Sequence, residues 1–371
     1  MTKSNLLILS DPPIAPGYLP RLRYMCQYLH EQGYDVHLFT EEREPLCFEH
    51  TYPITTIPTY TGNTIDWLVK AIWSLITNWH EQHFAKAVEE QIQNKHYDGI
   101  LCTTFSTFPL GAAVQIAQNR HIPLIADIRD LDEQVEHSTY QYAHQQWWLK
   151  PFRVLYRAIQ LRRRNKAIRQ ANIITTVSPW HVEFIKQYNP HVHLIYNGFD
   201  PKQFYFQAVS SDVFRITYIG SMFEHYDLSP LYQAVKELQL EHVVVDIHTP
   251  KQQPIAHTEL GDTIRESSIM LVLTGQKTHG MMTTKFSEAL GCEKPILCIP
   301  SDKGCLAQAM VETNAGLASD NIEEIKQFIL DKYNEWKQNG FTRQPVRNIE
   351  QFNRENQAKQ FEDLFCHYTR L

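Results

Sequence analysis

The sequence lacks the cysteine spacing of a metal framework or a disulfide-stapled domain. Its 371 residues include seven cysteines, an odd number, and no two of them are separated by two residues. Close pairs are typical of structural zinc sites, and even sets are typical of small secreted domains. We therefore expect no metal site and a reducing, cytoplasmic environment. The cysteines are Cys26, Cys47, Cys102, Cys292, Cys298, Cys305 and Cys366.

Long apolar runs and excess positive charge are missing as well. The apolar stretch in MTKSNLLILSDPP is too short for a signal peptide, and no segment approaches the roughly 20 apolar residues of a membrane-spanning helix. The formal net charge is -6, which argues against a general nucleic-acid binder. The sequence shows no repeat of fixed period and no low-complexity tract.

Apolar residues, in contrast, are plentiful and regularly placed. They make up 43% of the sequence. A chain of 371 residues is too long for one ordinary hydrophobic core. Short apolar runs alternate with helical periodicity from NLLILS to VHLIYNG, and again from FRITYIGS to KPILCIP. This alternation predicts parallel sheets flanked by helices. We expect an α/β protein of two doubly wound domains, with a hinge near NGFDPKQFYFQAVSSD, where the periodicity lapses.

Ligands of open α/β sheets bind at the carboxyl ends of the strands, so the loops there are candidate sites. In SDPPIAPGYLPR, Gly17 precedes a helix and would let backbone N–H groups approach a phosphate or sugar. ADIRDLDEQ gathers Asp127, Arg129 and Asp130 at a strand end, and IYNGFD leaves the sheet through a turn. A plain turn, a self-paired surface loop and a structural turn are the alternative interpretations of these three segments.

The stretch TTKFSEALGCEKPILCIP places Lys285 and Glu288 one helical turn apart. Thr283 or Thr284 is expected to cap this helix. A cation in the first turn is disfavoured by the helix dipole unless an anion is bound there, so Lys285 indicates a phosphate. Glu288 lies on the same face and can accept hydrogen bonds from a ribose or sugar diol. An ordinary ion pair between the two side chains is the alternative, and the spacing favours neither.

These segments fit one family pattern. DPPIAPGYLPRLRYMCQYLHEQGYDVHLFT is similar to a family opening of strand, loop, helix and strand. IPLIADIRDL, ITTVS, IYNGFDPKQF and KFSEALGCEKPIL are similar to its later segments. Over nearly the whole chain, the sequence thus resembles the family 4 retaining glycosyltransferases, GT-B enzymes that build bacterial polysaccharides and glycolipids.

The resemblance implies a fold and a division of labour. The GT-B fold has two Rossmann-like domains facing a cleft, expected here over residues 1–205 and 206–351. The C-terminal helix, within 352–371, is expected to return to the first domain through Phe361 and Phe365. The second domain would bind a nucleotide diphosphate sugar. The first would bind a glycan or lipid-linked acceptor in cell-surface polysaccharide or glycolipid synthesis, and no metal or other cofactor is implied.

The same resemblance implies roles for particular residues. Lys285 would neutralise the leaving diphosphate, Glu288 would hold the ribose or donor sugar, and Asp127 would orient the acceptor hydroxyl. On the acceptor side, Asp127 is joined by Arg129 and Asp130. The expected donor contacts are Gly17, Gly220, Gly280, Thr283, Thr284, Lys285 and Glu288. The choice of sugar and nucleotide depends on loops such as HTPKQQPIAH, which no general rule interprets.

Two features depart from the family pattern. Gly280 stands where the family often has a first glutamate, and the segment SMFEHYDL lacks the usual arginine and lysine. Two other hypotheses therefore stay open. One is a catalytically weakened GT-B protein that binds a nucleotide sugar or glycan as the partner of another transferase. The other is a GT-B epimerase, which needs no acceptor.

A basic, aromatic stretch suggests a further partner. Between His137 and Val182 there is no acidic residue, while arginines and lysines alternate with aromatic residues. Such a helix is typical of proteins that lie on an anionic membrane, and a solvated face or a site for an anionic polymer is the alternative. IDWLVKAIWSLITNWH is interpreted either as added apolar membrane contact or as a core helix. The residues expected to face a membrane are Trp147, Trp148, Arg153, Arg157, Arg162, Arg163 and Arg164.

Overall fold

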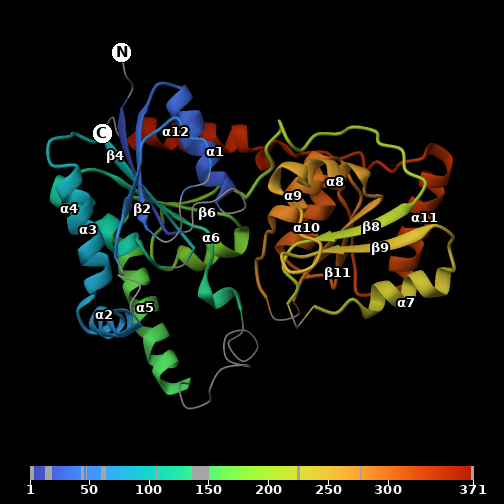
Figure 1. Cartoon of the computed structure of the whole chain (residues 1–371), viewed down its shortest axis with the longest axis horizontal. Coiled ribbons are helices and arrows are strands. Elements are labelled where there is room, and N and C mark those ends of the chain that lie inside the picture. Colours follow the sequence, from blue (N-terminus) through green and yellow to red (C-terminus); the bar gives the residue numbers. More distant parts are fainter. Residues whose placement is uncertain are drawn as a thin grey trace. The chain divides into compact units, whose positions relative to one another are not determined.

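The structure is a computed structural model, and its contacts divide the chain into two compact units. The first unit comprises Met1–Ile195 and Ala358–Leu371, and the second comprises Tyr196–Gln357. Figure 1 shows a sheet with flanking helices in each unit. The residues that the structure describes are 4–12, 19–42, 46, 48–59, 64–105, 107–135, 150–223, 226–275 and 278–368.

The first unit is built on a seven-stranded parallel sheet with the order β3-β2-β1-β4-β5-β6-β7. The order reverses between β1 and β4, so the carboxyl ends of these two strands form the switch point at which such sheets bind ligands. The strands are β1 (Asn5–Ser10), β2 (Asp35–Glu41), β3 (Ile54–Ile57), β4 (Gly99–Thr104), β5 (Leu124–Ile128), β6 (Ile173–Thr176) and β7 (Val192–Leu194).

Helices cover both faces of this sheet, which explains why its central strands are apolar throughout. One face packs against α3, α4, α5 and α6, with Phe84 and Ile116 in that core. The other packs against α1 and α12, where Phe361 and Phe365 are buried; Figure 1 shows α12, in red, beside α1. The helices are α1 (Pro20–Glu31), α2 (Thr64–Thr77), α3 (Trp79–Gln91), α4 (Leu110–Arg120), α5 (Lys150–Gln170), α6 (Pro179–Ile185) and α12 (Arg354–Tyr368).

The second unit is a smaller version of the same design. Its five parallel strands have the order β12-β11-β10-β8-β9, with the switch point between β8 and β10. Cores on both faces pack the sheet against α8, α9 and α10 on one side and α7 and α11 on the other. The strands are β8 (Phe214–Ile219), β9 (Val243–His248), β10 (Ile269–Leu273), β11 (Ile296–Ile299) and β12 (Gly316–Ala318). The helices are α7 (Ser229–Leu238), α8 (Leu260–Glu266), α9 (Thr284–Gly291), α10 (Cys305–Thr313) and α11 (Ile322–Asn339).

The expected α/β class is therefore confirmed. The alternation of apolar runs and helical segments corresponds to two doubly wound parallel sheets in tandem. Each sheet has one switch point, and the loops at its two strand ends are where a ligand site is expected.

Candidate functional site

Helix α9 starts at the carboxyl end of β10, and Thr283 caps it. The Thr283 hydroxyl accepts a hydrogen bond from the backbone N–H of Phe286 at 3.3 Å, which confirms one of the two expected caps. Phe286 and Leu290 are buried in the core below β10 and β11. This packing fixes the first turn of α9, and with it Lys285, at the edge of the sheet where ligands bind.

The Lys285 side chain passes directly over Gly220, which follows β8. A Cβ atom on Gly220 would lie 2.2 Å from Cε and 2.6 Å from Nζ of Lys285, so only glycine leaves room for this path. Lys285 Nζ also lies 5.5 Å from the centre of the Tyr218 ring. Since β8 and β10 are the strands that flank the switch point, the ammonium group lies at the expected ligand position of the second unit.

Lys285 and Glu288 are partly buried charged groups that do not pair with each other. Among the described residues, neither side chain makes an ion pair within 4.0 Å or a hydrogen bond. Burial lowers the pKa of Lys285, and Glu288 partly offsets this. Burial raises the pKa of Glu288 to about 7, although Arg354 and Lys285 act in the opposite direction. An ordinary ion pair is thus not what the structure contains, and both groups are candidates for contact with a ligand.

The first residues of the second unit also contact the loop before α9. The Asn197 side-chain amide donates to the carbonyl oxygen of Met282 at 3.5 Å, just before α9. A Cβ atom on Gly198 would lie 2.4 Å from the Phe352 carbonyl oxygen, so Gly198 allows this segment to approach the one that carries Arg354. Sequence reasoning treated IYNGFD as a turn. It missed Arg354, whose charge lowers the pKa of Glu288, because Arg354 and Glu288 lie far apart in the chain.

The remaining expected donor residues are placed as follows. Gly280 is buried and has a φ of 62°, the left-handed region that favours glycine, in the loop before α9. Thr284 is the first residue of α9. Gly17 lies outside the described residues.

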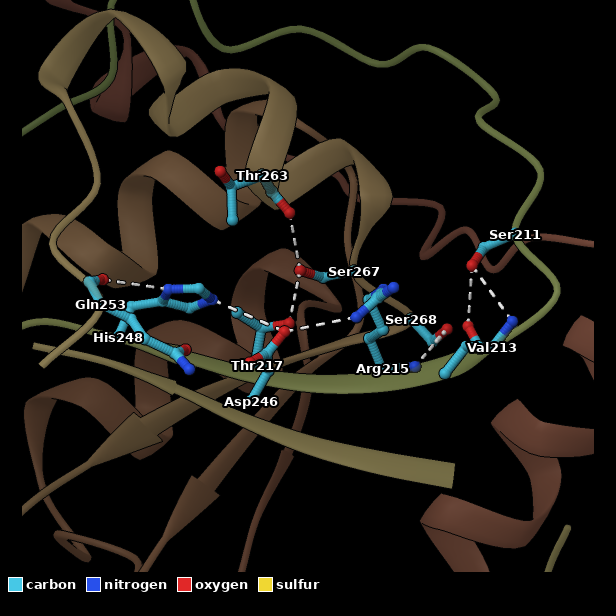
Figure 2. Close-up of polar contacts among 10 residues, drawn as sticks. All are labelled: Ser211, Val213, Arg215, Thr217, Asp246, His248, Gln253, Thr263, Ser267 and Ser268. Carbon is cyan, nitrogen blue, oxygen red and sulfur yellow. Dashed lines mark hydrogen bonds and ion pairs between the residues drawn. The ribbon is translucent and has the colours of Figure 1, made fainter. Parts of the chain in front are cut away.

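The loop after β9 is held by a polar network (Figure 2). The His248 ring is hydrogen-bonded to the Gln253 carbonyl oxygen at 3.2 Å, and its Nε2 atom lies 3.6 Å from the Asp246 carboxylate. Asp246 also pairs with Arg215 of β8 at 3.4 Å. These contacts fix the start of the HTPKQQPIAH loop to the edge strand, close to the switch point of the sheet.

The first unit carries its own polar cluster at its switch point. Arg129 Nη2 donates to Asp11 Oδ1 at 3.0 Å, and the Phe105 backbone N–H donates to Asp11 Oδ2 at 2.9 Å. The Arg129 guanidinium lies 3.7 Å from the centre of the Phe105 ring. Burial raises the pKa of Asp11 to about 6, although Arg129 and the backbone N–H lower it. Asp11 closes the first strand, so its position beside a proline pair was the sequence signal that could have identified it.

Asp127 lies deeper than expected for a group that meets an acceptor. Its Oδ1 atom accepts hydrogen bonds from Arg21 and Thr175 at 2.9 and 2.7 Å. Its Oδ2 atom accepts one from Thr103 at 2.9 Å, and the residue is 3% exposed. Both oxygens are engaged in joining α1 to β4, β5 and β6, which is a structural role. Asp130, in contrast, is exposed.

Comparison with known proteins decides the family. The sequence model of glycosyltransferase family 4 matches residues 21–203. The chain belongs to this family. Members of this family are retaining, nucleotide-sugar-dependent transferases. Among curated proteins, none matches its sequence significantly.

The fold of this family 4 glycosyltransferase is similar to that of several solved structures over nearly the whole chain. Sucrose-phosphate synthase from Thermosynechococcus elongatus is 15% identical, with a TM-score of 0.67 over 98% of this chain and 99% of that one. HepE from Anabaena, in complex with UDP, is 13% identical, with a TM-score of 0.61 over 98% and 100%. WaaG, a glycosyltransferase involved in lipopolysaccharide biosynthesis, is 9% identical, with a TM-score of 0.58 over 97% and 99%. The expected GT-B class is confirmed at the level of the fold.

One residue expected to face a membrane is buried instead. Arg164 of the glycosyltransferase is 0% exposed and donates two hydrogen bonds to the Glu133 carboxylate, at 2.8 and 2.7 Å. The expectation for Arg164 is wrong because its acidic partner comes from just before the acid-free stretch, in the turn after β5. Burial raises the pKa of Glu133, but the hydrogen bonds and charge of Arg164 outweigh burial and leave it lowered.

The other arginines of the set differ in their exposure. Arg157 pairs with Asp132, and Arg163 donates to the Ser74 carbonyl oxygen at 2.7 Å. Arg162 is exposed. Trp147 and Trp148 lie outside the described residues, and the side chain of Arg153 is not described.

Replacing Arg164 with methionine is expected to lower the free energy of unfolding by about 3 kcal/mol, since it removes one partner of a buried ion pair. Chemical denaturation measures this change. Arg162→Met, on the exposed face of the same helix, should shift stability by less than about 0.5 kcal/mol. A second change, Glu133→Leu, should restore most of the loss. A loss no larger than that of Arg162→Met would mean that water solvates Glu133 fully.

Proposed function

We propose that this glycosyltransferase moves a hexose from a uridine diphosphate sugar to a glycan or lipid-linked acceptor. Retention of the anomeric configuration and a place in cell-surface polysaccharide or glycolipid synthesis are parts of the proposal. The observation that carries it is the Lys285 ammonium, which crosses Gly220 at the switch point, beside Glu288, and forms no ion pair with any residue that the structure describes. Uridine is chosen because HepE, of the same fold, has been solved with UDP and with UDP-glucose.

Transfer requires charge to be stabilised on the departing diphosphate. Lys285 supplies a full positive charge, and the first turn of α9 adds the positive end of its dipole. Both are fixed before the reaction begins, so little energy is lost to reorganisation. The Glu288 carboxylate, once ionised, accepts hydrogen bonds from two neighbouring hydroxyls of the ribose or the sugar.

The acceptor is assigned to the cluster at the switch point of the first unit. Asp11 and Arg129 supply an acceptor and a donor of hydrogen bonds at the ends of β1 and β5. The Phe105 ring lies against the Arg129 guanidinium and holds it in place. Asp11 takes over the orienting role first expected of Asp127, and Asp130 remains a candidate at the rim.

Turnover distinguishes this function from the two other hypotheses. Release of UDP from UDP-glucose and related donors is measured with and without lipid-linked and soluble glycan acceptors. Release that requires an acceptor supports transfer. Binding without release would support the weakened partner protein, which is favoured by Gly280 and by the missing basic pair in SMFEHYDL. Isomerisation of the donor without an acceptor would support the epimerase.

Gly220→Ala tests the path of Lys285. The new Cβ atom would collide with the lysine side chain, and a φ of 141° strains any residue but glycine. We expect donor affinity to fall at least about tenfold, and stability by about 1–3 kcal/mol. Gly340→Ala, at a φ of 76° after α11, carries similar strain away from the site and should leave affinity unchanged. Equal affinities for both variants would show that Lys285 does not need this path.

A further inference from the structure

Helix α2 turns an apolar stripe outward. Val69, Ile72, Trp73 and Ile76 are 60%, 46%, 53% and 72% exposed. Their spacing places them on one side of the helix, along two successive turns. Of the α2 side chains that the structure describes, all those that are exposed belong to this stripe. Helix α2 is therefore not buried on all sides.

Two polar residues of α2 whose side chains are described, Lys70 and Ser74, point toward the protein instead. Lys70 donates to the Thr59 carbonyl oxygen at 3.0 Å, and its ammonium lies 5.4 Å from the centre of the Trp79 ring. The Ser74 hydroxyl accepts the backbone N–H of His80 at 3.1 Å. A surface helix normally buries its apolar side and exposes its polar side. The outward stripe of α2 departs from this rule, and it lies in water unless another apolar phase covers it.

The start of α5 adds to this surface. Val154, Leu155 and Tyr156 are 54%, 59% and 44% exposed. The bond from Arg163 to the Ser74 carbonyl oxygen joins the two helices, and Figure 1 shows α2 beside α5 at the lower end of the first unit. Apolar side chains on two adjoining helices thus form one candidate surface.

The charges near the stripe favour an anionic lipid surface as its partner. Arg162 and Lys166 are exposed on α5, and residues 138–181 contain no acidic residue. A second copy of the same face would bring like charges together, whereas anionic lipid headgroups complement them. Tryptophan and aliphatic residues beside basic ones are the composition of helices that lie in the headgroup region of a bilayer.

We propose that the outward stripe of α2, together with the exposed start of α5, is the surface on which this protein lies on an anionic bilayer. Ile72, Trp73 and Ile76 enter the headgroup region, and Arg162 and Lys166 contact lipid phosphates. None of the described helices is both long and apolar enough to cross a membrane. The stripe replaces the buried Arg164 as the membrane-facing element, and the proposal does not depend on the donor site.

Co-sedimentation of the full-length protein with vesicles tests this surface. Phosphatidylcholine vesicles are compared with vesicles that also contain phosphatidylglycerol. The wild type should bind the anionic vesicles, and Ile72→Ser with Ile76→Ser should weaken binding by about 100-fold, roughly tenfold for each residue. Arg162→Gln should weaken it about fivefold, since each cation near the surface contributes separately.

Val311→Ser is the matched control, because Val311 of α10 in the second unit is 72% exposed, as is Ile76. It should bind vesicles as the wild type does. All of these side chains are exposed, so circular dichroism and turnover with a soluble acceptor should stay unchanged. A wild type that ignores anionic vesicles, or stripe variants that bind them fully, would overturn the proposal. So would a lipid-free dimer that Ile76→Ser converts to a monomer in sedimentation velocity, because the stripe would then cover a second copy.

Discussion

Replacing Lys285 with methionine is expected to lower kcat/KM for sugar transfer by a factor of about 100–1000, as removal of one charge-stabilising group does in other enzymes. About tenfold of this loss should come from weaker donor binding and the rest from kcat, because the charge on the leaving diphosphate grows as its bond to the sugar breaks. Methionine keeps the length and apolar stem of lysine, so the path over Gly220 stays filled. Initial rates of UDP release give both constants.

Lys337→Met provides the control for this change. Lys337 is exposed in the last turn of α11, far in sequence from the site, and lies against the rings of Tyr333 and Trp336. It should keep the wild-type rate. If Lys285→Met kept it too, the diphosphate charge would be met by other groups, and the assignment of Lys285 would fail.

Glu288→Gln is expected to make the protein more stable above neutral pH while it weakens donor binding. The folded-state pKa of Glu288 is about 7, against an ordinary value of 4.5, so the folded protein binds this proton more tightly than the unfolded chain does. The stability that this tighter proton binding contributes is present below pH 4.5 and is lost as the pH rises through 7. Above that range, burial of the ionised carboxylate costs up to about 3 kcal/mol, which glutamine avoids.

Denaturation at about pH 5 and about pH 8 checks the sign, since the gain should be small at the first and about 2–3 kcal/mol at the second. Donor affinity should fall at least about tenfold and lose its rise between about pH 6 and 8. Glu312→Gln, exposed on α10, should change neither quantity. A variant less stable than the wild type at the higher pH would mean that Glu288 is paired in the fold, and our interpretation of the site would be wrong.

The parts of the fold set by local signals could be predicted from sequence. The Asn321 side chain and Gly340, two residue types typical of helix ends, close the two ends of α11. The Thr283 cap is equally local. Capping depends on residues within one turn, so a linear sequence carries the whole signal.

Other features depended on partners distant in the chain. Arg164 is buried because Glu133 reaches it, and Asp127 is engaged because Thr103 and Thr175 flank it on neighbouring strands. Spacing also left open whether Lys285 pairs with Glu288. The structure decides this through the lysine's route over Gly220, 65 residues earlier, which no periodicity reports.

Calorimetric titration of the full-length protein with UDP tests the donor site most directly. The wild type should bind, Lys285→Met and Gly220→Ala should each bind at least about tenfold more weakly, and Lys337→Met should bind as the wild type does. UDP affinity that is the same in the wild type and Lys285→Met, or no binding by the wild type at all, would contradict the assignment of the diphosphate to Lys285.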